Sequence, residues 1–256
     1  MSNWRSKLGV VVSWSSNEAQ FLKPQLREIL VFADHVVYSI GTRLYDMRPE
    51  ILPRVPDKVS IARYEVSSDV VERPRKYHNL AREVGVSALP DDAKWVLFLD
   101  ADEIPDGAMF KAWFDEMEKH LFKGLAYKFA CHWYFVRPTW RAVNLEDSIV
   151  LVHRDQLTPA ALADEGERDG IVRRCPGGCM RSLKNKEDLP MFHHFSWVRS
   201  KEQMLHKVQT WGHRKDREDW STLVHRVWTA DAPPADGDFV HGYTYDIVED
   251  RFDISL

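Results

Sequence analysis

The sequence predicts an α/β fold with a doubly wound sheet, and two patterns indicate it. In the first part of the chain, short apolar runs of strand character alternate with segments of helical spacing. One run, residues 95–99, is apolar without a break and leads directly into Asp100, Asp102 and Glu103. Such a run is typical of a strand buried on both faces. Because open α/β sheets bind ligands at the carboxyl ends of their strands, the acidic cluster marks a candidate site.

The remaining elements follow from the same reasoning. Apolar runs predict strands at 8–14, 35–40, 59–64, 94–99, 125–136 and 148–153. Helical spacing predicts helices at 18–33, 74–86, 106–121, 200–213 and 220–228. Asn17 is of the type that caps a helix start, here that of the first helix. Residues 158–169 have the composition of a charged surface segment, and no repeat or low-complexity linker divides the chain.

Composition limits the class of protein. The chain has 256 residues, of which 44% are hydrophobic and 29% charged, and this balance allows a buried core. The formal net charge of −4 argues against strong non-specific attraction to nucleic acid or anionic membrane. No apolar stretch approaches the roughly 20 residues of a membrane span, and the first residues lack a signal-peptide core, so we expect a cytoplasmic protein. The spacing of Cys175 and Cys179 is not that of a zinc pair, which favours free thiols.

The acidic cluster suggests metal chemistry. Side chains alternate along an extended chain, so Asp100 and Asp102 are expected on one side, where they repel unless a cation lies between them. Oxygen ligands suit Mg²⁺ or Mn²⁺, which commonly hold substrate phosphates as well. The chain lacks a Walker-type phosphate loop, so a metal and side-chain cations would have to neutralise a phosphate. The alternative is a strand followed by a solvated acidic turn.

Three blocks, in order, resemble the GT-A glycosyltransferases of the family 2 type: VVVSWSSNEAQFL, HNLAREVGVSALPDDAKWVLFLDADEIPD and HHFSWVRSKEQMLHKVQTWGH. The last block is also similar to family 17 transferases and related viral enzymes. The resemblance implies a single GT-A domain over residues 1–256. Residues 1–105 would form the half that binds the nucleotide sugar. Residues 106–256 would form a mixed-sheet acceptor half with C-terminal helices.

The resemblance also implies roles for individual residues. Asp100 would contact the donor ribose or sugar, directly or through the metal, and Asp102 would bind the metal. His194, which opens His-Phe-Ser-Trp, would be the imidazole ligand, with the adjacent His193 as the alternative. The other implied donor contacts are Ser13 and Asn17 near the base, Asn79 and Arg82 along the donor, and Lys207 at the diphosphate.

The activity implied is a metal-dependent, inverting transfer of a sugar from a nucleotide diphosphate sugar to an acceptor hydroxyl. The cofactor would be Mn²⁺ or Mg²⁺, and the family favours a UDP-sugar donor. Glu146 and Asp147, just before an apolar strand, are candidates for the general base that removes the acceptor proton. An ordinary turn before a strand explains these two carboxylates equally well.

The sequence is compatible with other functions. Residues 38–46 lack the Asp-x-Gly-Ser-x-Asp pattern frequent in family 2, so the base of the donor nucleotide is not fixed. A nucleotidyltransferase on a related fold would share the carboxylates, but the His-Phe-Ser-Trp block argues against it. The acceptor could be a glycan or, in a phage-type enzyme, a hydroxymethylated DNA base. A non-catalytic protein that binds a nucleotide or sugar is the remaining alternative.

Overall fold

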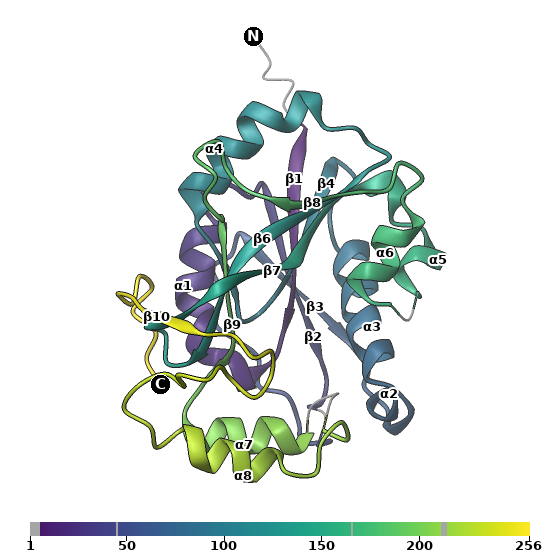
Figure 1. The fold of residues 1–256 in the computed structure, drawn as a ribbon. Helices are drawn as coiled ribbons and strands as arrows, with labels where there is room; N and C mark the ends of the chain where they lie inside the picture. Colours follow the sequence, from purple (N-terminus) through teal and green to yellow (C-terminus); the bar gives the residue numbers. More distant parts are fainter. Residues whose placement is uncertain (1–5, 45, 165, 211–213) are drawn as a thin grey trace.

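Helices cover both faces of one curved, mixed β-sheet (Figure 1). This computed structural model describes residues 6–44, 46–164, 166–210 and 214–256. Within them the strand order is β3-β2-β1-β4-β7-β6-β9-β5, with β10 paired to β7 and β8 to β6. The mixed α/β fold predicted from the sequence is therefore confirmed. Among the described residues, no helix is both long enough and apolar enough to cross a membrane.

The strands are β1 (Lys7–Trp14), β2 (His35–Gly41), β3 (Val59–Tyr64), β4 (Ala93–Asp100), β5 (Glu103–Pro105), β6 (Ala126–Val136), β7 (Trp140–His153), β8 (Cys179–Leu183), β9 (Phe192–Val198) and β10 (Tyr245–Ile247). The α-helices are α1 (Ala19–Ile29), α2 (Ser68–Glu72), α3 (Pro74–Ser87), α4 (Gly107–Met117), α5 (Pro159–Leu162), α6 (Arg168–Arg174), α7 (Lys201–Thr210) and α8 (Trp220–Val227).

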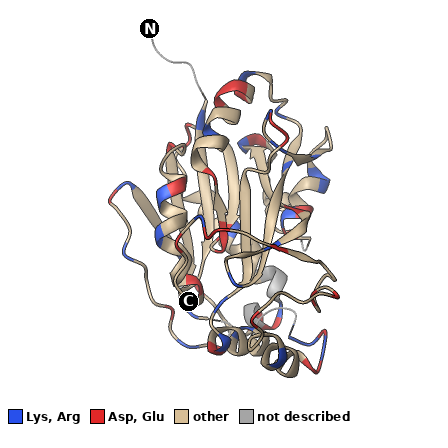
Figure 2. Cartoon of the chain, turned by 60° about the vertical axis from the view of Figure 1, so that its left-hand side comes forward, with Lys and Arg blue, Asp and Glu red and all other residues tan. Residues whose placement is uncertain are grey.

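Buried strands at the centre of the sheet separate two apolar layers. Along β4, Leu97 and Leu99 pack into the core on one face. Val96 and Phe98 pack into the core on the other face. The unbroken apolar run in the sequence is thus the direct consequence of burial on both sides. Figure 2 shows the same division, because the strands are mostly tan while blue and red concentrate on helices and loops.

The sheet changes direction at β4. β1, β2, β3 and β4 run parallel to one another, whereas β7 pairs with β4 antiparallel. Helices α1 and α3 lie on opposite sides of the parallel strands (Figure 1). The chain therefore leaves β1 toward one face and reaches β4 from the other. This makes a topological switch point between the two strands, the place where open α/β sheets bind ligands. Ser13 and Asp100 are Cα partners there.

Two local features differ from expectation. A short 3₁₀ helix precedes α1, and the side chain of Ser15, rather than that of Asn17, caps its start. The Ser15 hydroxyl accepts a hydrogen bond from the backbone nitrogen of Asn17 at 3.4 Å. Segment 158–169 is not merely a charged surface stretch, because α5 and the start of α6 occupy it. Thr158 caps α5 by accepting a hydrogen bond from Ala161 N at 3.2 Å. Both helices are too short for their apolar spacing to stand out in the sequence.

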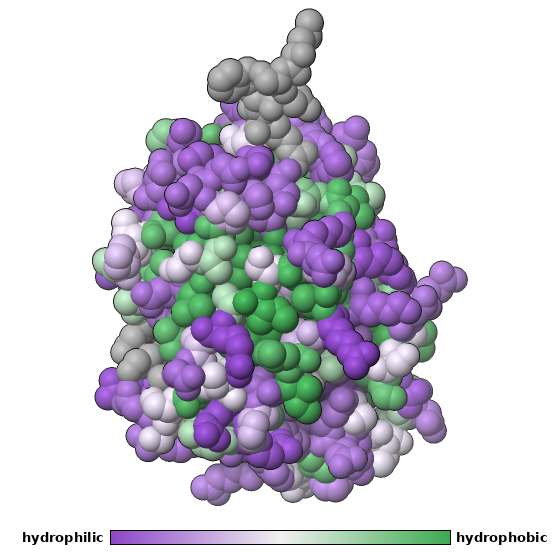
Figure 3. All heavy atoms as spheres, turned by 180° about the vertical axis from the view of Figure 1, so that it is seen from behind, coloured by the Kyte–Doolittle hydropathy of each residue, from purple (hydrophilic) through white to green (hydrophobic). Residues whose placement is uncertain are grey.

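The back of the molecule carries a broad apolar area with polar residues around it (Figure 3). Much of any protein surface is apolar, so this area alone does not identify a binding function. At the bottom of the view in Figure 1, α7 and α8 pack together below the sheet. Their buried residues Met204, Val208 and Val224 share a core with Trp197 of β9. This packing fixes α7 close to the strand that carries the two histidines.

Helix α1 is tied to the acidic turn by a buried glutamine. Gln25 Nε2 donates to the backbone oxygens of Asp100 and Glu103, both at 2.8 Å. Its Oε1 accepts from the hydroxyl of Tyr38 at 2.8 Å. Gln25 is fully buried, so all of these groups lose water on folding and depend on one another. The glutamine therefore fixes the turn after β4 against the helix.

We expect Gln25→Leu to destabilise the protein by about 2–4 kcal/mol, because it leaves two carbonyls and a hydroxyl buried without this partner. Tyr38→Phe removes only one of the bonds and is expected to cost about 1–2 kcal/mol. Urea unfolding followed by circular dichroism measures both. Equal losses in the two variants would show that the contacts of Gln25 with the turn are unimportant.

Candidate active site

The turn after β4 is built around a buried glutamate. Glu103 is fully buried, and its Oε2 accepts a hydrogen bond from the backbone nitrogen of Asp100 at 2.8 Å. Arg168 of α6 binds both of its oxygens, at 2.6 and 2.9 Å. The same guanidinium donates to Asp100 Oδ2 at 3.2 Å. Arg168 therefore pairs with two carboxylates of the motif at once. Sequence reasoning missed it, since nothing in the sequence joins residues 65 positions apart.

Arg82 approaches Asp100 from the other side. It is 2% exposed, and one nitrogen lies 3.7 Å from Asp100 Oδ1 and 3.8 Å from Glu167 Oε2. Burial lowers the pKa of this guanidinium. Among the described residues, neither terminal nitrogen has a hydrogen-bond partner. Buried donors without partners are uncommon in proteins, and an anionic ligand beside Asp100 would satisfy them.

The side chain of Asn79 has a structural contact in this arrangement. Its amide donates to the backbone oxygen of Asp164 at 2.7 Å and so ties α3 to the segment before α6.

The residues expected near the base lie at the end of β1 and just after it. Ser13 lies beside Asp100 at the carboxyl end of β1. Asn17 lies in the 3₁₀ turn between β1 and α1. The next residue, Glu18, accepts from Arg199 at 2.7 Å, a contact that sequence reasoning did not identify.

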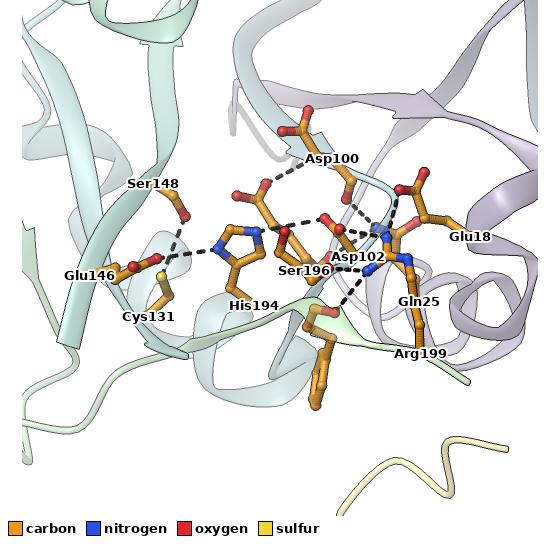
Figure 4. Close-up of polar contacts among 12 residues, drawn as sticks. Glu18, Gln25, Asp100, Asp102, Cys131, Glu146, Ser148, His194, Ser196 and Arg199 are labelled. Atoms are coloured by element: carbon orange, nitrogen blue, oxygen red, sulfur yellow. Dashed lines mark hydrogen bonds and ion pairs between the residues drawn. The ribbon is translucent and has the colours of Figure 1, made fainter. Parts of the chain in front are cut away.

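Asp102 lies in a second group of charges (Figure 4). Its Oδ2 accepts from Arg199 at 3.1 Å and lies 3.7 Å from Lys207 Nζ. Its Oδ1 lies 3.7 Å from His194 Nε2. Burial raises the pKa of Asp102, but Lys207, His194 and Arg199 outweigh it and hold the pKa far below its ordinary value. Asp102 is therefore ionised.

Lys207 lies on α7, within the helix predicted at 200–213. Its ammonium donates to the backbone oxygen and the hydroxyl of Ser196, at 2.8 and 3.1 Å. Burial lowers its pKa to about 8, with Arg199 adding to the effect. A buried ammonium beside a second cation is stabilised by any anion that enters. The structure therefore places the Lys207 ammonium in the charged group around Asp102.

Asp100 and Asp102 do not share one partner, contrary to the expectation from strand alternation. The strand ends at Asp100, and residues 101–102 form a turn, so the period of two does not extend to Asp102. Arg82 and Arg168 contact Asp100, whereas Asp102 faces His194, Arg199 and Lys207. Arginine and lysine side chains thus relieve the repulsion that the sequence suggested a metal would relieve.

The two adjacent histidines of β9 lie on opposite faces of their strand. His194 lies between two carboxylates, with Nε2 toward Asp102 and Nδ1 at 3.4 Å from Glu146 Oε2. Burial lowers its pKa, but Glu146 and Asp102 raise it more, and the net shift is upward. His193 is buried against aromatic rings, and its Nδ1 bonds with the hydroxyl of Tyr134 at 2.9 Å. Burial holds its pKa well below the ordinary value.

Glu146 joins this group, whereas Asp147 does not. Glu146 Oε1 lies 3.3 Å from Nε2 of His241, a residue of the C-terminal loop. Asp147 accepts a hydrogen bond from the Ser182 hydroxyl at 3.0 Å instead. Of the two carboxylates considered as the general base, only Glu146 therefore lies beside His194. His241 is a further residue of the site that sequence reasoning missed, because the loop that carries it has no recognisable motif.

Asp102 and His194 lie close enough to share a divalent cation. One oxygen of Asp102 and one nitrogen of His194 face each other at 3.7 Å, and both are types that bind Mn²⁺ or Mg²⁺. Both oxygens of Asp100 face arginines, so the first aspartate of the motif does not join them in this arrangement. Of the two aspartates of the motif, Asp102 is therefore the one that lies beside His194.

Comparison with known proteins gives a likeness in structure alone. No known family profile matches the sequence, and no curated protein matches it. The chain is similar to a homologue of Mycobacterium tuberculosis Rv0371c from Mycobacterium sp. strain JC1, with TM-score 0.41 and 13% identity over 73% of this chain and 89% of that one. It is also similar to the glycosyltransferase GlyE of Streptococcus pneumoniae TIGR4, with TM-score 0.40 and 11% identity over 88% of this chain and 64% of that one.

A third solved structure is a mutant of the Drosophila β-1,4-galactosyltransferase 7 in complex with manganese, UDP-Gal and xylobiose. Its TM-score is 0.40, with 12% identity over 73% of this chain and 70% of that one. At these scores and identities, the likenesses carry no argument about activity.

We expect Arg168→Met to destabilise the protein by about 3–5 kcal/mol, because it leaves Glu103 buried and charged without its partner. Arg173→Met is the matched control on the same helix. Arg173 is exposed and pairs with Asp164, so its loss is expected to cost under about 1 kcal/mol. Urea unfolding measures both, and the double variant Arg168→Met/Glu103→Gln should recover at least half of the loss. Failure of the double variant to recover stability would contradict the buried pairing.

Proposed function

We propose that this protein is a metal-dependent glycosyltransferase that takes its sugar from a nucleotide diphosphate sugar, with UDP as the favoured nucleotide. The observation that carries the proposal is the Asp102–His194 pair beside buried cations at the switch point of the sheet. A bound Mn²⁺ or Mg²⁺ would stabilise the negative charge that develops on a leaving diphosphate. Asp102 and His194 are the residues that would hold it.

The diphosphate would lie among Arg199, Lys207 and Arg82. Arg199 is 1% exposed and pairs with Asp102. Lys207 lies 3.7 Å from the same carboxylate. Arg82 brings buried donors that have no hydrogen-bond partner among the described residues. Cations held in a site shielded from water stabilise developing charge strongly, since they need no rearrangement during the reaction. These residues supply the electrostatic part of the reaction.

The nucleoside would lie toward β1. Ser13 and Asp100 are neighbours at the carboxyl ends of two parallel strands, which is where a ribose hydroxyl could reach the carboxylate. Asp100 would accept from the ribose or the sugar, and Asn17 lies on the turn that follows β1. Asn79 would not contact the donor but would hold in place the segment that leads to Arg168.

Glu146 is the better placed of the two candidate bases. It lies next to His194, on the side away from Asp102, and its carboxylate is partly open to solvent. A carboxylate there would remove the proton of an acceptor hydroxyl as that oxygen attacks the sugar carbon, a contribution of about 10²–10⁴-fold. Attack from the side opposite the diphosphate inverts the anomeric centre. The acceptor would be a glycan in this proposal.

We expect UDP to bind at least about tenfold more weakly in EDTA than in Mn²⁺, because the diphosphate adds charge that the protein cations only partly balance. Isothermal titration calorimetry in the two buffers measures the difference. Magnesium should substitute for manganese. Equal affinity with and without the metal would contradict a site in which metal and diphosphate bind together.

We expect Asp102→Asn and His194→Ala each to lower the release of UDP from a UDP-sugar by at least about 10²-fold, as the loss of a cation ligand should. His193→Ala is the matched control at the adjacent position. It is expected to lower the melting temperature while leaving the manganese requirement unchanged, because His193 packs against rings. If His193→Ala raises the manganese requirement and His194→Ala does not, the two roles are reversed.

A further inference from the structure

A second group of metal-binding side chains lies on the other side of His194. Cys131 of β6, Glu146 of β7 and His194 of β9 each offer one ligand atom, and these atoms lie within 4.8 Å of one another. Cys131 and Glu146 are Cα partners across β6 and β7, and Trp133 pairs with His194 across β6 and β9. We call these three residues the Cys131 cluster. Figure 4 shows them converging from neighbouring strands.

The ligand types of the Cys131 cluster are those of zinc rather than of magnesium or manganese. A thiolate is a soft ligand that selects Zn²⁺, and sulfur, imidazole and carboxylate ligands together are typical of zinc sites. The distance between His194 Nδ1 and Glu146 Oε2 is 3.4 Å. Two ligands of one tetrahedral zinc ion lie about 3.4 Å apart, so this pair is already spaced for it.

The charge environment also favours a cation here. Asp102 has Arg199 and Lys207 beside it, which oppose a metal that arrives alone. In the described part of the chain, the ion-pair partners of Glu146 are two histidines, and Cys131 Sγ lies 3.3 Å from the hydroxyl of Ser148. His241 is 36% exposed in its side chain, so the Glu146 side of the cluster opens toward solvent.

We propose that the Cys131 cluster binds Zn²⁺, and that the bound zinc inhibits sugar transfer. Zinc would take the Cys131 thiolate, a Glu146 oxygen and the Nδ1 lone pair of His194, with His241 or water at the fourth position. The Cys131 thiol proton leaves to solvent, and the single ring proton of His194 then lies on Nε2, facing Asp102. An N–H in that position cannot bind a second metal, and Glu146 no longer serves as a base.

Zinc binding is inferred from the Cys131 cluster alone, whereas the inhibition rests on the proposed function, in which His194 and Glu146 take part.

The binding test uses cobalt(II) as the spectroscopic probe and zinc as the competitor. Cys175→Ser/Cys179→Ser leaves Cys131 as the one remaining cysteine. Added Co²⁺ should give a sulfur-to-cobalt charge-transfer band in this variant, and one equivalent of Zn²⁺ should remove it. Cys131→Ser in the full chain should lose the band and weaken zinc binding at least about tenfold. Cys175→Ser alone is the matched buried-cysteine control and should keep both properties.

The binding claim is overturned if the variant with Cys131 alone folds but gives no band, or if the band depends on Cys175 instead. Cys131→Ala serves as a second variant should Cys131→Ser fail to fold. If neither folds, the spectrum of the Cys175→Ser/Cys179→Ser variant decides the claim by itself.

The inhibition test measures UDP binding in excess Mn²⁺, with and without one equivalent of Zn²⁺. In the parent protein zinc should weaken UDP binding at least about tenfold, and in Cys131→Ser it should change it less than about twofold. If the cobalt band appears but zinc does not change UDP binding, the inhibition is wrong and the zinc-binding claim stands. If Mn²⁺ does not change UDP binding, the proposed function is wrong, and the cobalt band still tests whether zinc binds.

Discussion

Compensation of buried charge around the turn after β4 is the constraint on which the site depends. Glu18, Asp100, Asp102 and Glu103 face the cations of Arg82, Arg168, Arg199 and Lys207, so the charges are close to balanced. An ionised carboxylate as buried as Glu103 is tolerated only with a partner and hydrogen bonds. Helices α3, α6 and α7 and the segment after β9 each supply one cation. The elements of both halves of the chain are thereby held against one strand end.

This balance has a consequence for the order of binding. A divalent cation that enters alone adds positive charge beside Arg199 and Lys207, and a diphosphate that enters alone adds negative charge beside Asp100 and Asp102. Each is opposed by the charges already present. The two together change the net charge of the site little. In the proposed function, the metal and the diphosphate would therefore bind together, since each offsets the charge that the other adds.

The sequence was sufficient for the parts of the fold that are local in character. Residues 95–99 form an unbroken apolar run, from which a strand buried on both faces could be predicted. The position of Asp100 at the end of that strand followed from it. The contacts of Arg168 and His241 could not be predicted, since each joins segments far apart in the chain by tertiary packing alone. The separate charged partners of Asp100 and Asp102 could not be predicted either, because a turn replaces the strand after Asp100 and alternation holds only inside a strand.

The imidazole of His194 belongs to both groups of candidate metal ligands. It has one nitrogen toward Asp102 and the other toward Glu146, and a neutral ring can bind a metal through only one of them while the other carries the proton. A carboxylate that accepts the N–H of a metal-bound histidine fixes the ring and strengthens the ligand. Each carboxylate can thus act as ligand or as orienting partner, according to which side the metal occupies. Fixed cations beside Asp102 make its side depend on an anionic ligand, whereas the thiol of Cys131 makes the other side selective for a soft metal. Under the two proposals, the choice between activity and inhibition would then depend on which metal and which anion are present.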